Sequence, residues 1–304
     1  MWNAEIFTRM RLPEPGDLAG AGRRFLAEGD SWFTLGTLNL SQGTNVLLEL
    51  KFKQRNAVMS WAYPGDTLQR MVDAINDRDF DRSLWDRPGS NLASFWEGII
   101  ISAGGNDLIA AAEVPPVLDN QPVPLNKRLF LTAAEAGPGG PLARISEPGW
   151  STLSGYLLNN FGVLVERKER GPSRQSPLFI HTYAIPAARP SGVSSSSRGW
   201  LFAAMEAYGI APDDMQPVCS ELFERLRRLL LSLDNDSGDP RSLKTVHVFD
   251  SAALPDIVPA TPGATGVSGD WVNEIHLTAG GYRKMGRAFG QFIDETVDRY
   301  FGPL

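Results

Sequence analysis

The chain has 304 residues, of which 42% are hydrophobic and 21% charged, and its formal net charge at pH 7 is −6. This length suits one large α/β domain, and no stretch contains the roughly 18 apolar residues that a membrane span needs. The net negative charge, together with the acidic residues that interrupt the most basic segment (166–170), argues against a nucleic-acid surface. The single cysteine, Cys219, excludes an internal disulfide and a cysteine-based metal cage.

The predicted elements alternate between strands and helices along the chain. Residues 1–23 mix proline, glycine and charged residues without periodicity, and we interpret them as an arm that leads into the first strand. Five apolar runs predict buried strands at 24–28, 57–63, 98–103, 178–184 and 246–249. Apolar residues at helical spacing predict helices at 45–50, 68–75, 125–136, 150–170, 218–233 and 278–300. The serine-rich segment 189–199 predicts a flexible surface loop.

This alternation predicts an α/β fold in which helices cover both faces of an open, mostly parallel, five-stranded sheet. Such a fold is a three-layer α/β/α sandwich. We expect residues 1–304 to form a single domain, and we interpret the proline- and glycine-punctuated region 111–170 as an insertion or lid within it. The segment Met1–Ile6 lacks the basic and apolar regions of a secretory signal, so we expect a cytoplasmic protein.

Polar residues follow three of the predicted strands. The motif Gly-Asp-Ser ends at Ser31, Pro-Gly-Asp contains Gly65, and Gly-Gly-Asn-Asp contains Asn106. Because the carboxyl ends of parallel strands meet at one edge of a sheet, we expect these turns to lie close together. Ser31 is then a candidate nucleophile. The backbone N–H groups of Ser31 and Gly65 and the side-chain amide of Asn106 are candidate donors to an oxyanion.

A candidate general base lies near the end of the sequence. His276 comes just before the last predicted helix, in a loop from which a histidine can reach a neighbouring turn. The other two histidines, His181 and His247, lie inside apolar runs, and we interpret them as hydrogen-bonded core residues. Structural explanations exist for the other motifs: Gly65 suits any turn with a positive φ, and Asn106 suits a helix cap. Only the combination of nucleophile, donors and base indicates catalysis.

With these motifs in place, the sequence resembles the SGNH hydrolases, which are also called GDSL-type esterases and lipases. Gly29-Asp30-Ser31 is similar to the family's nucleophile block, and Gly65 is similar to its glycine block. Gly104-Gly105-Asn106-Asp107 is similar to its Gly-x-Asn-Asp block, and His276 to its histidine block, all in the family's order. The resemblance spans most of the chain. It implies a flavodoxin-like three-layer fold and ester hydrolysis by the family's serine, without metal or cofactor.

One position departs from the family's pattern. The family usually has an aspartate three residues before the histidine, and this chain has Asn273. An amide oxygen accepts the imidazole N–H but brings no negative charge, and the same change in a serine protease lowers turnover about ten-thousand-fold. We place Asn273 in the orienting position. Asp270 or Glu274 remains an alternative source of the charge, and a backbone carbonyl is an alternative partner for His276.

Two functions therefore remain. The first is a serine hydrolase that cleaves a carboxylic ester, of the esterase, lipase or carbohydrate acetylesterase type. The second is a protein on the same scaffold that binds an ester or glycan but turns it over weakly or not at all, because of Asn273. The presence of a candidate nucleophile, donor and base together favours the enzyme. The expected partner is a small-molecule or acylated-carbohydrate ester.

Overall fold

In the part of the chain that the structure describes, the central sheet has six strands. The computed structural model describes residues 1–14, 16–18, 20–34, 43–73, 75–84, 95–194 and 197–304. Within these residues the sheet order is β10-β9-β6-β3-β5-β2, and every neighbouring pair is parallel. The strands of this sheet are β2 (Glu5–Thr8), β3 (Arg24–Gly29), β5 (Ala57–Ser60), β6 (Gly98–Ser102), β9 (Leu178–His181) and β10 (Val246–Phe249).

The strand order identifies the fold class. The five strands that the sequence predicts, numbered along the chain, lie in the spatial order 2-1-3-4-5, with β2 added outside β5. This is the flavodoxin-like order, and its direction reverses between β3 and β6. β3, β6 and β9 are almost fully buried, as expected for strands that are covered on both faces. The predicted flavodoxin-like three-layer fold is therefore confirmed.

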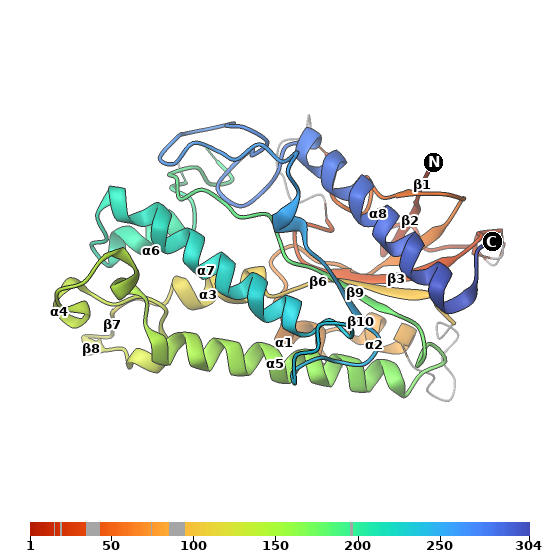
Figure 1. Cartoon of the computed structure of the whole chain (residues 1–304), viewed down its shortest axis with the longest axis horizontal. Helices are drawn as coiled ribbons and strands as arrows, with labels where there is room; N and C mark the ends of the chain where they lie inside the picture. The colour runs from red at the N-terminus through yellow and green to blue at the C-terminus, as the bar shows by residue number, and fades with distance from the viewer. Residues whose placement is uncertain (15, 19, 35–42, 74, 85–94, 195–196) are drawn as a thin grey trace.

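Helices cover both faces of the sheet. Figure 1 shows the long helix α8 along one face and α5 along the other. α5 also contacts α1, α2 and α3. No described helix is long and apolar enough to cross a membrane. The helices are α1 (Leu68–Met71), α2 (Arg78–Leu84), α3 (Gly105–Ala112), α4 (Ala133–Ala136), α5 (Glu147–Glu169), α6 (Leu201–Ala207), α7 (Pro212–Ser232) and α8 (Ala279–Phe301), with the 3-10 turns η2 (Leu125–Lys127), η3 (Pro141–Arg144) and η4 (Ser251–Ala253).

The last helix, α8, packs very close to the backbone of a short strand near the start of the chain. The short strand β4 (Lys51–Phe52) pairs antiparallel with β1 (Trp2–Asn3), and α8 contacts β4. A Cβ atom at Gly290 of α8 would lie 2.5 Å from the carbonyl oxygen of Lys51. Glycine is therefore required there for the helix to approach the backbone so closely. This contact fixes the position of α8 and of the loop that leads into it.

The amino-terminal arm contributes a strand that the sequence does not predict. Residues Glu5–Thr8 of the arm form β2, which pairs in parallel with β5 at the edge of the sheet. Among the described residues the sheet thus has six strands and not the predicted five. The run is short, and Phe7 is its only buried residue, so it shows no alternation that would mark it as a strand.

Three of the predicted helices differ from the structure. The segment 45–50 is a turn, in which the side-chain oxygen of Asn45 accepts the N–H of Leu48. The segment 68–75 is helical only in the four residues of α1, and residue 74 lies outside the described residues. The segment 125–136 contains two short pieces, η2 and α4. The longer predicted helices at 150–170, 218–233 and 278–300 correspond to α5, α7 and α8.

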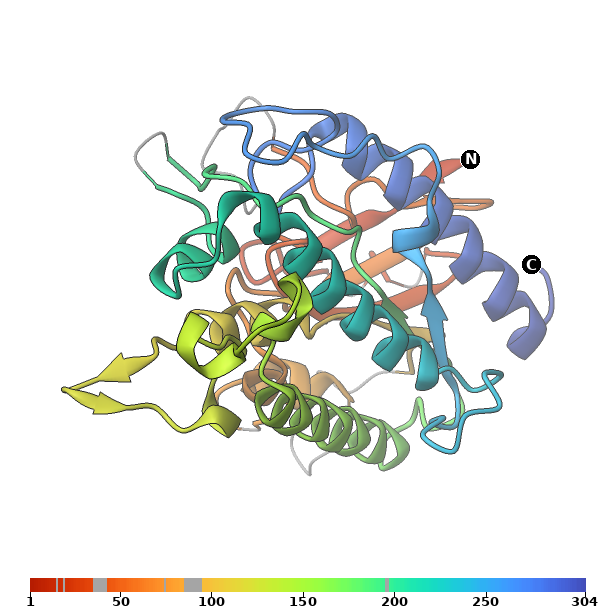
Figure 2. The ribbon, with the colours of Figure 1, turned by 60° about the vertical axis from the view of Figure 1, so that its left-hand side comes forward.

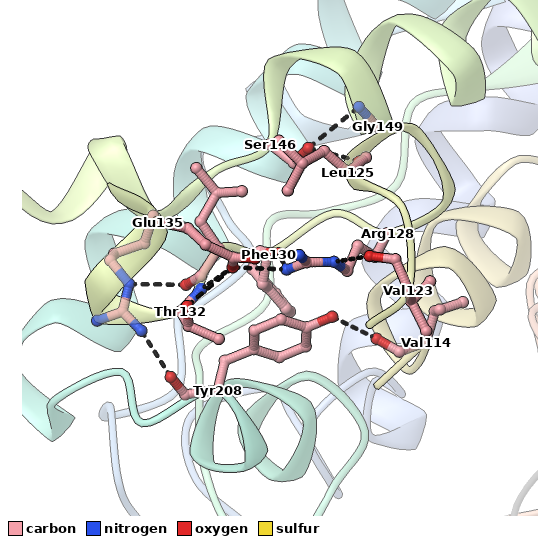
Figure 3. Close-up of polar contacts among 12 residues, drawn as sticks. Val114, Val123, Leu125, Arg128, Phe130, Thr132, Glu135, Ser146, Gly149 and Tyr208 are labelled. Carbon is pink, nitrogen blue, oxygen red and sulfur yellow. Dashed lines mark hydrogen bonds and ion pairs between the residues drawn. The ribbon is translucent and has the colours of Figure 1, made fainter. Parts of the chain in front are cut away.

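The region that we interpret as an insertion or lid is tied to the body of the protein by polar contacts (Figure 3). Near its start a hairpin of β7 (Val117–Leu118) and β8 (Gln121–Pro122) projects from the molecule (Figure 2). After the hairpin in the sequence, the buried guanidinium of Arg128 donates to the carbonyl oxygens of Val123 and Phe130 and pairs with Glu135, all within this region. The hydroxyl of Tyr208, after α6, donates to another carbonyl of this region. Its role as a lid stays a prediction.

Candidate active site

Ser31 and His276 meet at the carboxyl edge of the sheet. Ser31 follows β3, and its Oγ lies 2.7 Å from Nε2 of His276. His276 lies in the loop before α8, 245 residues further along the chain. Both residues are buried, with 8% and 3% of their surface exposed. The strand order reverses between β3 and β6, so Ser31 lies where open α/β sheets bind their ligands.

Asn273 holds the other ring nitrogen of His276. Its Oδ1 lies 3.1 Å from Nδ1 of His276 and also accepts the backbone N–H groups of Ile275 and His276. Backbone N–H groups only donate, so they fix which end of the amide is the oxygen. Nδ1 therefore carries a proton, and Nε2 presents its lone pair to the hydroxyl of Ser31. This is the tautomer that a general base needs.

The two alternative sources of negative charge, Asp270 and Glu274, bind groups other than His276. Asp270 pairs with Lys284 at 2.6 Å and accepts the N–H of Val258 at 2.7 Å. Glu274 accepts the backbone N–H groups at the start of α6, and burial raises its pKa to about 7. Among the hydrogen bonds of the described residues, neither carboxylate reaches His276. The structure therefore places Asn273, and neither acid, beside the imidazole.

Asp30 is anchored by a buried network under the Gly-Asp-Ser turn. Its carboxylate accepts the N–H of Trp32, the hydroxyl of Ser102 at 2.7 Å and the hydroxyl of Tyr183. Nε2 of His181 lies 2.8 Å from Oγ of Ser102, and Nδ1 accepts the N–H of Tyr183. Burial raises the pKa of Asp30 to about 6 and lowers the pKa of His181 to about 3. His181 is thus a neutral, hydrogen-bonded core residue, and the network holds the turn in place.

The turns that carry Asn106 and Gly65 are linked to each other. The side-chain amide of Asn106 donates to the carbonyl oxygen of Asp66 at 2.9 Å. Gly65 has a φ of 80°, in the left-handed region that favours glycine. Asn106 and Ser31 line the same pocket, whereas Gly65 is not among the described residues that line it. The structure therefore brings Asn106 to the candidate nucleophile and places Gly65 next to the residue that Asn106 binds.

A small pocket opens beside Ser31. Its volume is about 20 Å³, and its polar lining residues include Ser31 and Asn106. The rest of the lining is mostly apolar, with Ile109, Tyr183 and Phe223 among its members. An apolar pocket with a few convergent polar groups is the usual form of a small-molecule site.

Burial sets the protonation state of His276. It lowers the pKa of the imidazole from 6.5 to about 4. The ring is therefore neutral at neutral pH, which is the form that can accept a proton from Ser31. The group that faces Nδ1 of this ring is the amide oxygen of Asn273 and not a carboxylate.

A buried arginine that the sequence places in a surface loop holds the loop of His276. Arg189 is fully buried and donates to the carbonyl oxygens of Trp271 and Asn273 at 3.3 and 2.6 Å. The beginning of the predicted flexible loop 189–199 is therefore part of the core, and residues 195–196 of that loop lie outside the described residues. No periodicity or motif marks Arg189, because its partners are backbone groups 82 and 84 residues away.

One group of described residues has the composition of a metal site. The ligand atoms of Asp234, Asp236 and His247 all lie within 4.8 Å of one another. Nε2 of His247 lies 2.8 Å from the hydroxyl of Tyr300. His247 lies near the start of β10, whereas Ser31 follows the end of β3, so this group is at the opposite edge of the sheet and outside the candidate active site.

Comparison with known proteins gives matches among solved structures. No protein-family model and no curated protein matches the chain. An extracellular lipase from Streptomyces rimosus is similar over 86% of this chain and 96% of its own, with 14% identity and a TM-score of 0.48. A putative arylesterase from Agrobacterium tumefaciens is similar over 90% of this chain and 99% of its own, with 18% identity and a TM-score of 0.40. A carbohydrate acetylesterase from Sinorhizobium meliloti has the same coverages and TM-score, with 15% identity. At these identities and TM-scores, the similarities carry no argument about the activity of this chain.

Proposed function

We propose that the protein is a serine hydrolase of the SGNH type that cleaves carboxylic esters. The observation that carries the proposal is the hydrogen bond between Oγ of Ser31 and Nε2 of His276, with Asn273 on the opposite ring nitrogen. A nucleophile, a base and an orienting acceptor in this arrangement recur in serine hydrolases of unrelated folds. The proposed substrate is a small-molecule or acylated-carbohydrate ester.

The reaction begins when Oγ of Ser31 attacks the carbonyl carbon of the ester and Nε2 of His276 takes the hydroxyl proton. The backbone N–H groups of Ser31 and Gly65 and the amide of Asn106 stabilise the charge that develops on the carbonyl oxygen. The bond to the alcohol then breaks, and His276 gives its proton to the departing oxygen. The acyl group stays on Ser31 until a water molecule, deprotonated by His276, releases the acid and restores the hydroxyl.

The orientation of Asn273 supports an enzyme over a protein that only binds the ester. A pure binder has no need of a histidine held in the base tautomer against a serine hydroxyl. The amide of Asn106 is also suited to catalysis. It has two N–H groups, of which one binds the carbonyl of Asp66. Because Asn106 lines the pocket, the proposed role of the other is to donate to the oxyanion.

Hydrolysis of p-nitrophenyl esters tests the proposal. The parent protein should turn over a short-chain ester, and Ser31→Ala should abolish turnover while leaving the circular dichroism spectrum and melting temperature unchanged. A fluorophosphonate should label the parent at Ser31 and fail to label the variant. Equal turnover by parent and variant, or labelling only at another serine, would contradict the assignment. Binding of an ester without turnover by the parent would favour the binding protein.

A further inference from the structure

The pocket beside Ser31 has little room. The space open to the centre of a water molecule is about 20 Å³, which is small for a ligand pocket. The pocket therefore suits a short group and not a long chain. Three of its apolar walls are Ile109 of α3, Tyr183 after β9 and Phe223 of α7. The apolar lining also includes Trp32, after β3, and Trp271 and Ile275, in the loop of His276.

The acyl group is the part of the ester that this pocket suits, if the proposed function is correct. The alcohol leaves after the first step, and the acyl group stays on Ser31 until water releases it. Ser31 and Asn106, which would hold the carbonyl group, both line the pocket, so its apolar part lies next to the reacting carbon. The substituent that remains attached to that carbon is the acyl chain.

The side chain of Tyr183, which lines the pocket, is held in place by contacts on several sides. Its φ is 62°, a left-handed conformation that a bulky residue rarely adopts. Its hydroxyl donates to Asp30, and its ring lies against Gly105, where a Cβ atom would be 2.9 Å from Cζ of the tyrosine. The ring of Trp32 packs on it edge-on, with the centroids 5.2 Å apart. Strained backbone of this kind persists where the surrounding structure holds it, and it is concentrated at functional sites.

We propose that Tyr183 is a specificity-determining residue which, together with Phe223, limits the acyl group of the substrate to a short chain. A short acyl group fits the space beside Ser31. A longer chain along this wall must displace a ring that its hydrogen bond, Gly105 and Trp32 hold in place. The substrate class is therefore esters of short acyl groups, and it excludes esters of long-chain fatty acids.

The test compares kcat/KM for p-nitrophenyl acetate, butyrate and octanoate. A methylene that a pocket cannot accommodate costs roughly tenfold or more, so octanoate should react at least about 100-fold more slowly than acetate. Tyr183→Gly removes the ring and adopts the left-handed conformation without strain, and it should raise the octanoate-to-acetate ratio at least about tenfold. Tyr183→Phe keeps the ring, loses only the contacts of the hydroxyl to Asp30 and Ser102, and should keep the ratio of the parent.

A second pair of variants separates the pocket from general destabilisation. Phe223→Ala should raise the same ratio, whereas Phe161→Ala should not, because Phe161 is a buried ring of α5 that does not line the pocket. The ratio is measured on one sample, so it does not depend on the fraction that is folded. A parent that prefers octanoate, or a Tyr183→Gly variant with the parental ratio, overturns the proposal. A parent that hydrolyses no ester and takes no fluorophosphonate on Ser31 overturns the proposed function instead.

Discussion

The amide oxygen of Asn273 faces Nδ1 of His276 because the same oxygen accepts two backbone N–H groups of its own turn. In a serine protease, asparagine at the corresponding place lowers turnover about ten-thousand-fold because the histidine takes the wrong tautomer. Here the turn directs the oxygen to the ring, so the tautomer is correct and only the negative charge is missing. We therefore expect a smaller deficit than in the protease.

Replacing Asn273 with aspartate tests whether the missing charge limits the rate. An ionised carboxylate stabilises the imidazolium that forms when His276 takes the proton of Ser31. Asn273→Asp should therefore raise kcat for p-nitrophenyl acetate about tenfold. A folded variant with an unchanged or lower kcat would show that the charge at this position does not limit turnover.

Asp270→Asn tests whether the neighbouring carboxylate has a catalytic role. Because Asp270 pairs with Lys284 and accepts the N–H of Val258, its loss should lower the free energy of unfolding by about 1 kcal/mol. It should change kcat by no more than about twofold, since the carboxylate does not reach His276. Thermal or urea unfolding and steady-state kinetics give the two numbers. Loss of most of the activity at unchanged stability would restore Asp270 as the source of charge.

Asn106→Ala tests the proposed oxyanion donor. Removal of one such donor lowers kcat by about a hundred- to a thousand-fold, and KM should change little because the charge exists only in the transition state. The melting temperature controls for the bond that the amide also makes to the carbonyl of Asp66. A variant that keeps kcat but loses affinity would assign Asn106 to binding of the ground state.

The pH profile of kcat/KM should report the low pKa of His276. The base acts in its neutral form, so activity is present above the pKa and is lost as the pH falls through about 4. Asn273→Asp should move this acid limb to higher pH, because a carboxylate favours the imidazolium. Asp270→Asn should leave the limb in place. A parental limb near 6.5, the value of an unperturbed histidine, would contradict the burial of the ring.

Arg189→Met tests whether the buried guanidinium positions the loop of His276. Loss of its bonds to the carbonyl oxygens of Trp271 and Asn273 should shift the imidazole and lower kcat about 100-fold, with little change in KM. Arg189→Lys keeps a cation that can bind these carbonyl oxygens, so its kcat should lie between those of Arg189→Met and the parent. A structural role in another region would not explain that order. Arg198→Met, in the same loop but largely exposed, is the matched control and should keep the parental rate. Equal kcat in Arg189→Met and the parent would exclude the positioning role.

Much of the site can be predicted from the sequence because its residues follow predicted strands. Ser31 comes directly after an apolar run, Asn106 follows three consecutive isoleucines, and parallel strands bring such turns to one edge. His276 is recognisable from its place before the last helix. The roles of these residues remain predictions, but the structure brings all three to one place.

The residues that support the site could not be predicted in the same way. Ser102 reaches Asp30 from β6 and Tyr183 reaches it from the segment after β9, and only the tertiary structure brings them together. Arg189 and Glu274 bind backbone groups, which leave no pattern in the sequence. The wrong helix at 45–50 has a related cause. Three of its four apolar residues are buried by tertiary packing of a turn, which a short window cannot distinguish from a helical face.

The 245-residue separation of Ser31 and His276 also affects how the protein gains activity as it folds. His276 is available only when the loop before α8, the last helix, has been made. Contacts between such distant segments form late, because closing a long loop has a large entropic cost. A refolding chain can therefore bury most of its sheet before the two residues meet. Recovery of the proposed esterase activity should lag behind recovery of secondary structure, and a nascent chain released before α8 would leave one face of the sheet exposed to aggregation.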